Sequence, residues 1–235
     1  GPGILAPGDV VDGCHAMTPK YLRHQLGVSL RALGLDKVDL FHLHNPEQQR
    51  PSLGPDRFRV AMGAAFEACE ELASEGLIAD YGCATWNGFR VGVEAPEHLS
   101  LEELVTLARE VGGDGHHFRW IQVPLNLALP EALIAPTQSW DGQAMPLLQA
   151  AHAAGLRVQT SASIMQARIL RQIPPQVGGA LGTQTPAQTA LQFTRSCPGV
   201  TVALCGMSRV EHVQENVAVL HLPKSDPALL QQFVG

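Results

Sequence analysis

With 235 residues and 45% hydrophobic side chains, the chain is long enough for one large α/β domain or two small ones and can bury a sizeable core. Its 16 Lys and Arg residues against 22 Asp and Glu residues give a formal charge of -6 without a basic cluster, which argues against a nucleic acid partner. The sequence contains no apolar run of about 18 residues and no basic-then-apolar leader. We therefore expect a soluble, cytoplasmic protein that does not bind membranes.

Short apolar runs alternate with longer amphipathic ones along the chain, which indicates a repeated strand–helix unit. The predicted strands, each bounded by turn residues, are 37–44, 78–85, 119–126, 156–163 and 200–206. Helices are predicted to begin at Thr18 before Pro19, over 56–74 with an end at Gly76, at Ser100 with Glu103, at Thr185 before Pro186, and at Ser208 with Glu211.

A strand followed by a helix, repeated roughly every 40 residues, predicts an α/β fold with a parallel sheet and favours a (β/α)8 TIM-type barrel. Only five strands are predicted, whereas a complete barrel has eight. We therefore expect residues 1–235 to form a single, N-terminally incomplete barrel domain, truncated to about five βα units that correspond to strands 4–8. The unpaired strand edges of such a piece predict self-association or pairing with a missing N-terminal fragment.

Two histidines lie at the end of the first predicted strand, in the stretch VDLFHLHNP. His42 and His44 are two residues apart, so on a strand they project to one face, which is the interior in a barrel. Three interpretations stay open: a divalent metal site, two packed imidazoles, or a histidine that donates a hydrogen bond to a substrate carbonyl. The other predicted strand ends supply none of the further histidines and carboxylate that a metal site needs, so we expect no metal. His44, at the mouth, is better placed than His42 to bind a substrate.

The last strand-to-helix junction, VALCGMSRVEHVQEN, has the features of a phosphate site. Gly206 permits a tight turn, Ser208 caps a helix whose first amides point outward, and Arg209 adds a positive charge. Barrels frequently bind phosphate through such a helix N-terminus near strands seven and eight. The alternative is that Ser208 and Glu211 form only a capping box and that Arg209 is a solvated charge.

Two amides, Gln122 and Asn126, interrupt the apolar strand WIQVPLN and share one face. Buried amides need hydrogen-bond partners, which either a cofactor amide or the neighbouring backbone would supply.

The sequence contains five cysteines, and none of them are spaced as a CxxC pair. They are expected to be reduced and mostly buried thiols, as in a cytoplasmic protein.

These stretches together resemble the C-terminal two-thirds of an aldo-keto reductase. The matching pieces are SLRALGLDKVDLFHLHNP, ELASEGLIADYGCATWN, WIQVPLN, GLRVQTSAS and ALQFTRSCPGVTVALCGMSRVEHVQEN, in the family's order. The resemblance implies a (β/α)8 barrel that binds a nicotinamide cofactor, usually NADPH with NADH as the alternative, and reduces an aldehyde or ketone to an alcohol.

The resemblance assigns roles to ten residues. His44 matches the catalytic histidine that orients the substrate carbonyl, and Gln122 matches the glutamine that binds the nicotinamide carboxamide. Thr85 and Ser161 stand where the family usually has, respectively, an asparagine beside the nicotinamide and the tyrosine that stacks on it. The adenosine end of the cofactor is assigned to Gly206, Ser208, Arg209, His212, Glu215 and Asn216.

The family's proton-donating tyrosine, with its lysine and aspartate, lies on the first three strands of the barrel. Those strands have no counterpart in the sequence, and neither Tyr21 nor Tyr81 is placed to replace the tyrosine, so we expect this chain alone to be inactive. Two alternatives to an oxidoreductase are a non-catalytic cofactor-binding or regulatory relative and a metal-dependent barrel hydrolase that uses His42 and His44.

Overall fold

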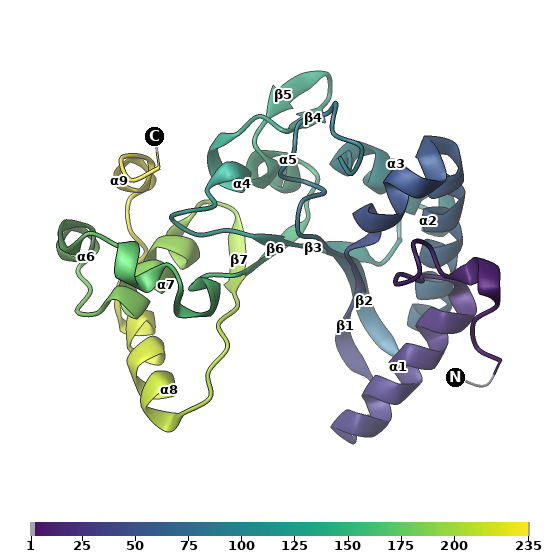
Figure 1. Cartoon of the computed structure of the whole chain (residues 1–235), viewed down its shortest axis with the longest axis horizontal. Coiled ribbons are helices and arrows are strands. Elements are labelled where there is room, and N and C mark those ends of the chain that lie inside the picture. Colours follow the sequence, from purple (N-terminus) through teal and green to yellow (C-terminus); the bar gives the residue numbers. More distant parts are fainter. Residues whose placement is uncertain (1–2, 235) are drawn as a thin grey trace. The chain divides into compact units, whose positions relative to one another are not determined.

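The computed structural model describes residues 3–234 and comprises two compact units, one ending at Ile121 and one beginning at Gln122. Within the described residues, five strands form one sheet in the order β1-β2-β3-β6-β7 (Figure 1). The pairs β1–β2 and β6–β7 are parallel. The prediction of an α/β chain with a five-stranded parallel sheet is confirmed, and β1 and β7 are its outer strands. Closure into a (β/α)8 barrel stays a prediction.

The first unit contains three helices longer than ten residues and the first three strands, the last of which continues into the second unit. Its elements are η1 (Pro7–Asp9), α1 (Pro19–Leu33), β1 (Val38–His44), η2 (Pro46–Gln49), α2 (Arg50–Ser74), β2 (Ile78–Ala84), α3 (Leu101–Gly112) and β3 (Phe118–Pro124).

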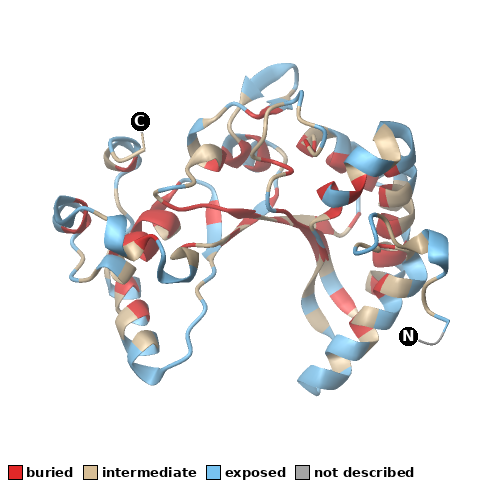
Figure 2. Ribbon diagram, in the orientation of Figure 1, coloured by how far each residue is buried: buried red, intermediate tan, exposed pale blue. Residues whose placement is uncertain are grey.

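Buried residues of the first unit gather on β2, on β3 and on the long helix α2 (Figure 2). Phe66 of α2, Tyr81 of β2 and Phe118 of β3 are fully buried, and their ring centroids lie between 5.1 and 5.7 Å apart. Burial of aromatic rings of this size contributes about 1.5–3 kcal/mol for each. A Cβ atom at Gly82 would lie 2.1 Å from the backbone oxygen of Trp120, so β2 and β3 approach closely because this position has no side chain.

The start of α2 differs from its prediction. The helix begins at Arg50 rather than near residue 56, but Gly54 interrupts it with a φ of 72°. Because only glycine adopts this conformation without strain and Pro55 starts a helical turn well, the regular helix resumes one residue before the predicted start. The predicted end is correct: Gly76 has a φ of 74° and its amide donates to the Ala73 carbonyl.

The second unit is built from shorter elements around β6 and β7. They are α4 (Glu131–Ile134), β4 (Gln138–Trp140), β5 (Gln143–Met145), α5 (Leu147–Ala153), β6 (Arg157–Ser161), η3 (Met165–Ala167), η4 (Leu170–Gln172), α6 (Pro175–Leu181), α7 (Pro186–Ser196), β7 (Val200–Ala203), α8 (Val210–Val217), η5 (Ala218–His221) and α9 (Pro227–Gln231). The hairpin of β4 and β5 was not predicted; its turn uses Asp141 and Gly142, both with positive φ.

Two of the predicted caps are present as hydrogen bonds. The Ser100 side chain accepts from the Glu103 amide at the start of α3, and the Thr185 side chain accepts from the Gln188 amide at the start of α7. Such local interactions stabilise a helix start by about 0.5–2 kcal/mol.

The thiols are free, as predicted, and three of the five are buried. Burial raises the pKa of Cys69 and of Cys197 to about 12 and also raises the pKa of Cys83. Cys14 is exposed and Cys205 is half-buried. Across residues 3–234, no helix combines the length and the apolar character that a membrane span requires.

Candidate active site

His44 and Thr85 belong to the first unit, and the other eight candidate residues belong to the second. His44 is the last residue of β1 and is exposed, whereas His42 is half-buried. In the β1–β2 register His44 lies opposite Ala84, and Thr85 follows directly as a buried residue. The predicted placement of His44 at the end of a strand is confirmed, and its role in binding a substrate stays a prediction.

A pocket of about 330 Å³ lies beside the two histidines. Its wall includes His15, Tyr21, His42 and His44. Within residues 3–234, no group of three or more His, Cys, Asp or Glu side chains has an arrangement that could hold a metal ion. The two strand-end histidines therefore have no set of further ligands in the described part of the chain.

The backbone of His44 is bound by a second histidine that sequence reasoning missed. The Nε2 atom of His15 lies 2.8 Å from the His44 carbonyl oxygen, and the Nδ1 atom of His15 lies 2.8 Å from the amide nitrogen of Gln49. Gln49 is only 3% exposed, and its amide nitrogen also contacts the His15 carbonyl at 3.4 Å. On the other side of the same peptide bond, the Asn45 amide donates to the Ala84 carbonyl at 2.6 Å.

Glu47 is the other buried polar residue in the segment after His44. It is 3% exposed, and its Oε1 atom accepts from the amides of Trp86 at 2.7 Å, Asn87 at 3.2 Å and Gly88 at 3.4 Å. These amides begin the loop after β2, in which Trp86 is half-exposed. Glu47 and Gln49 lie within three residues of HNP, which is the one sequence signal for them, since hydrophobic periodicity does not indicate a buried polar side chain.

In the second unit, Gln122 and Ser161 lie on the neighbouring strands β3 and β6, and both are half-buried. Asn126 is fully buried. Its Nδ2 atom donates to the Ala162 carbonyl at 2.9 Å, and its Oδ1 atom accepts from the amides of Ala128 at 2.7 Å and Leu129 at 3.0 Å. Of the two interpretations given above, Asn126 is thus the structural amide bound to neighbouring backbone.

The prediction that Ser208 caps a helix with Glu211 is wrong. Helix α8 begins at Val210 and its N-cap residue is Arg209, which makes no side-chain cap hydrogen bond. With the N-cap at 209, the third helical position is His212, so Ser208 and Glu211 are not spaced for a capping box. Gly206, Ser208 and Arg209 are all exposed in the extended segment before the helix.

His212, Glu215 and Asn216 lie on α8. The first two are half-buried, and the Glu215 carbonyl accepts from the Gln188 side chain at 3.0 Å. Asn216 is 7% exposed, and its Nδ2 atom contacts the sulfur of Cys205 at 3.5 Å. Its Oδ1 atom is buried and has no hydrogen-bond partner within residues 3–234.

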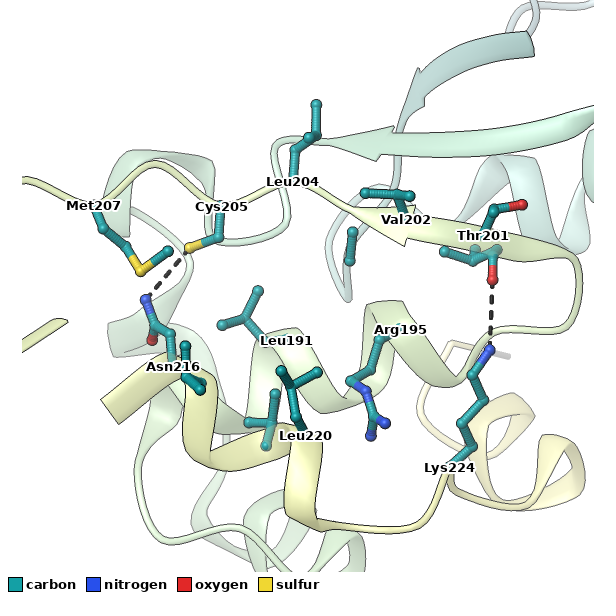
Figure 3. Close-up of a pocket in the computed structure, with 14 residues that line it drawn as sticks. Leu191, Arg195, Thr201, Val202, Leu204, Cys205, Met207, Asn216, Leu220 and Lys224 are labelled. Carbon is teal, nitrogen blue, oxygen red and sulfur yellow. Dashed lines mark hydrogen bonds between the residues drawn. The ribbon is translucent and has the colours of Figure 1, made fainter. Parts of the chain in front are cut away.

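Asn216 lines a pocket of about 490 Å³ between β7, α7 and the segment from α8 to Lys224 (Figure 3). Cys205 and Met207 lie near Asn216, whereas two cations missed by sequence reasoning, Arg195 and Lys224, lie toward the other end. Apolar side chains such as Leu191 and Leu220 form the wall between them. The structure thus brings Asn216 together with the residues that flank Gly206.

Three comparisons with known proteins bear on this arrangement. Residues 8–101 match the model of the Aldo/keto reductase family. A protein of Schizosaccharomyces pombe (strain 972 / ATCC 24843) named "Putative voltage-gated potassium channel subunit beta" is 23% identical over 250 residues, which cover 98% of this chain and 68% of that protein.

Two solved structures share the fold. An aldo-keto reductase from Bacillus halodurans in its holo form has a TM-score of 0.63 at 17% identity, covering 94% of this chain and 69% of that one. An aldo/keto reductase from Klebsiella pneumoniae in complex with NADP and acetate has a TM-score of 0.62 at 25% identity, covering 91% and 63%. The 235 residues therefore span about two thirds of the length of these relatives. Residues 8–101 thus match the aldo/keto reductase family, and the chain shares the fold of solved aldo-keto reductases.

Proposed function

We propose that this protein is a nicotinamide-dependent oxidoreductase that reduces an aldehyde or ketone to an alcohol. The observation that carries the proposal is the position of His44, an exposed imidazole at the carboxyl end of a parallel strand, where α/β enzymes bind their ligands. In this proposal the His44 imidazole donates a hydrogen bond to the substrate carbonyl oxygen. That bond orients the carbonyl and stabilises the negative charge that develops on its oxygen during reduction.

The residues of the second unit fit the adenosine end of NADPH. Asn216 Oδ1 is a buried acceptor without a partner within residues 3–234, and leaving such a group unpaired costs about 1–3 kcal/mol. An amino group of the cofactor would supply the missing donor. Arg209, the exposed N-cap residue of α8, would pair with a phosphate, which favours NADPH over NADH.

In the second unit, the nicotinamide end is assigned to Gln122 and Ser161 on the neighbouring strands β3 and β6. When bound, this end of the cofactor supplies the hydride. Asn126 is excluded from the assignment, because its amide nitrogen and oxygen form hydrogen bonds with backbone groups.

Reduction of a carbonyl also requires a group that donates a proton to its oxygen. Of the two tyrosines in the sequence, Tyr81 is fully buried in β2, and burial, with the nearby Glu70 carboxylate, raises its pKa far above the usual value. A tyrosine in that environment is a poor proton donor to a substrate. Tyr21 lies on α1 and lines the pocket beside His44. We expect these 235 residues alone to bind NADPH without turnover.

The test is a fluorescence titration of the 235-residue chain with NADPH and with NADH, followed by an assay of NADPH oxidation in the presence of a panel of aldehydes and ketones. Asn216→Ala should weaken binding of both cofactors about tenfold, the loss expected for one hydrogen bond to a buried acceptor. Arg209→Ala should weaken only NADPH. The matched control is His24→Gln, on the exposed face of α1.

Three outcomes are distinguished. Absence of NADPH binding at millimolar concentration would refute the cofactor assignment. Binding without turnover fits either the expectation above or a non-catalytic cofactor-binding relative, and addition of the first third of a related reductase would separate the two. Turnover that is lost in Tyr21→Phe would show that this chain supplies its own donor and would correct the expectation.

A further inference from the structure

In the first unit, two side chains and one backbone carbonyl form a series of hydrogen bonds that ends at His44. The series runs from the Gln49 amide through the His15 ring to the His44 carbonyl, with both ring contacts at 2.8 Å. Gln49 lies on η2, and His15 lies in a short loop closed by the hydrogen bond from the Val11 amide to the His15 carbonyl, at 2.8 Å.

The donor and the acceptor of each of these hydrogen bonds follow from which atoms carry a proton and which can only accept one. The His15 carbonyl oxygen can only accept, so the Gln49 atom that contacts it at 3.4 Å must be the amide nitrogen. The same nitrogen therefore gives its second proton to His15 Nδ1, which must present a lone pair. The His15 ring is then neutral with its proton on Nε2, and that proton points at the His44 carbonyl oxygen.

The peptide bond between His44 and Asn45 is held from both sides. His15 binds its carbonyl oxygen, and the Ala84 carbonyl accepts from its amide at 2.6 Å. Asn45 has a φ of 49°, a left-handed conformation that an asparagine tolerates but that is restrained here by these bonds. With this peptide fixed, the Cα–Cβ direction of His44 at the end of β1 is fixed as well.

We propose that His15 and Gln49 are positioning residues that fix the direction in which β1 presents the His44 imidazole. The inference rests on the proposed function, in which that imidazole binds the substrate carbonyl. Neither residue touches the substrate in this arrangement; both act through the backbone of His44.

The decisive variant is Gln49→Glu, which keeps the shape of the side chain and removes its protons. A carboxylate at this position can only accept, so it requires a proton on His15 Nδ1. The His15 ring must then either present a lone pair to the His44 carbonyl, which breaks the second link, or become an imidazolium. In the wild-type chain, long-range 1H–15N spectra should show His15 neutral with its proton on Nε2, and Gln49→Glu should abolish that pattern.

The second readout is the His44 ring in the same spectra. His15→Ala, which removes the bond to the His44 carbonyl, should broaden or shift the His44 ring signals. His15→Gln, whose amide can accept and donate in turn, should restore them, and the control His24→Gln should leave them unchanged. Three results would overturn the inference: a His15 tautomer protonated on Nδ1 in the wild-type chain, the wild-type His15 pattern retained in Gln49→Glu, or His44 signals that are the same in His15→Ala and in the wild type.

Titration with benzaldehyde in the presence of NADP+ separates this inference from the proposed function. If His44 binds the carbonyl, the His44 ring signals should shift in the wild type with an apparent affinity that falls about tenfold in His15→Ala and recovers in His15→Gln. No shift at His44 in the wild type would refute the proposed function, while the tautomer and the ring signals would still decide on the role of His15 and Gln49. An affinity unchanged in His15→Ala would overturn the positioning role even where the proposed function holds.

Discussion

Replacement of Glu47 by alanine should destabilise the chain through the loop after β2. The Glu47 Oε1 atom accepts from three backbone amides, those of Trp86, Asn87 and Gly88, at 2.7, 3.2 and 3.4 Å. Loss of the acceptor leaves these donors unpaired, at about 1–3 kcal/mol for a fully buried group. Because one of the three bonds is short and two are long, we expect a total loss of about 3 kcal/mol.

Glu47→Gln keeps an acceptor oxygen but removes the charge. Hydrogen bonds to an ionised acceptor are roughly twice as strong as neutral ones, so this variant should lose about half as much stability. Urea unfolding followed by circular dichroism measures both values. The control is Glu67→Ala, at an exposed position of α2, which should change the free energy of unfolding by less than about 0.5 kcal/mol.

Hydrogen exchange locates the effect. A loss of about 3 kcal/mol corresponds to roughly a hundredfold faster exchange of the Trp86 amide. The Glu103 amide, which the Ser100 side chain caps, should exchange as in the wild type. If Glu47→Ala unfolds at the same urea concentration as Glu67→Ala and the Trp86 amide keeps its exchange rate, the carboxylate does not hold the loop and the reasoning is refuted.

Two further predictions concern titratable groups. Three thiols, those of Cys69, Cys83 and Cys197, are buried and have raised pKa values, whereas Cys14 is exposed. Of these four thiols, we expect only that of Cys14 to react rapidly with a thiol reagent at neutral pH. Rapid labelling of Cys69 in the folded chain would contradict the structure. Burial, with the nearby Arg119 charge as a smaller cause, lowers the pKa of His116 from its ordinary value of 6.5. The unfolded chain therefore binds more protons at His116 than the folded chain does, so the free energy of unfolding should fall as the pH drops below 6.5. His116→Gln should flatten that part of the curve of unfolding free energy against pH, and an unchanged curve would show that His116 does not carry the effect.

Local patterns in the sequence are sufficient to predict the elements and some of their ends. Ser100 and Thr185 cap their helices because a cap joins residues three apart, and His44 ends its strand because the apolar run ends there. The same reasoning fails at Ser208, where a shift of the helix start by one residue removes the capping box. Residues able to cap a helix are common near helix starts, and a shift of the start by one residue changes which of them stands at the N-cap.

The surroundings of the candidate site depend on contacts that no local pattern encodes. Gln49 reaches His15 across 34 positions, Glu47 reaches the loop at Trp86 across 39, and Asn126 reaches the Ala162 carbonyl across 36. Each is a buried polar group, and such a group is retained only where the folded backbone places a partner within hydrogen-bond distance. The sequence by itself therefore determined the strand that carries His44. Tertiary structure alone decided that His15 and Gln49 form hydrogen bonds leading to the His44 carbonyl, that Asn126 binds backbone, and that Asn216 keeps an acceptor unpaired within residues 3–234. These outcomes depend on distances between segments, which the composition of each segment does not determine.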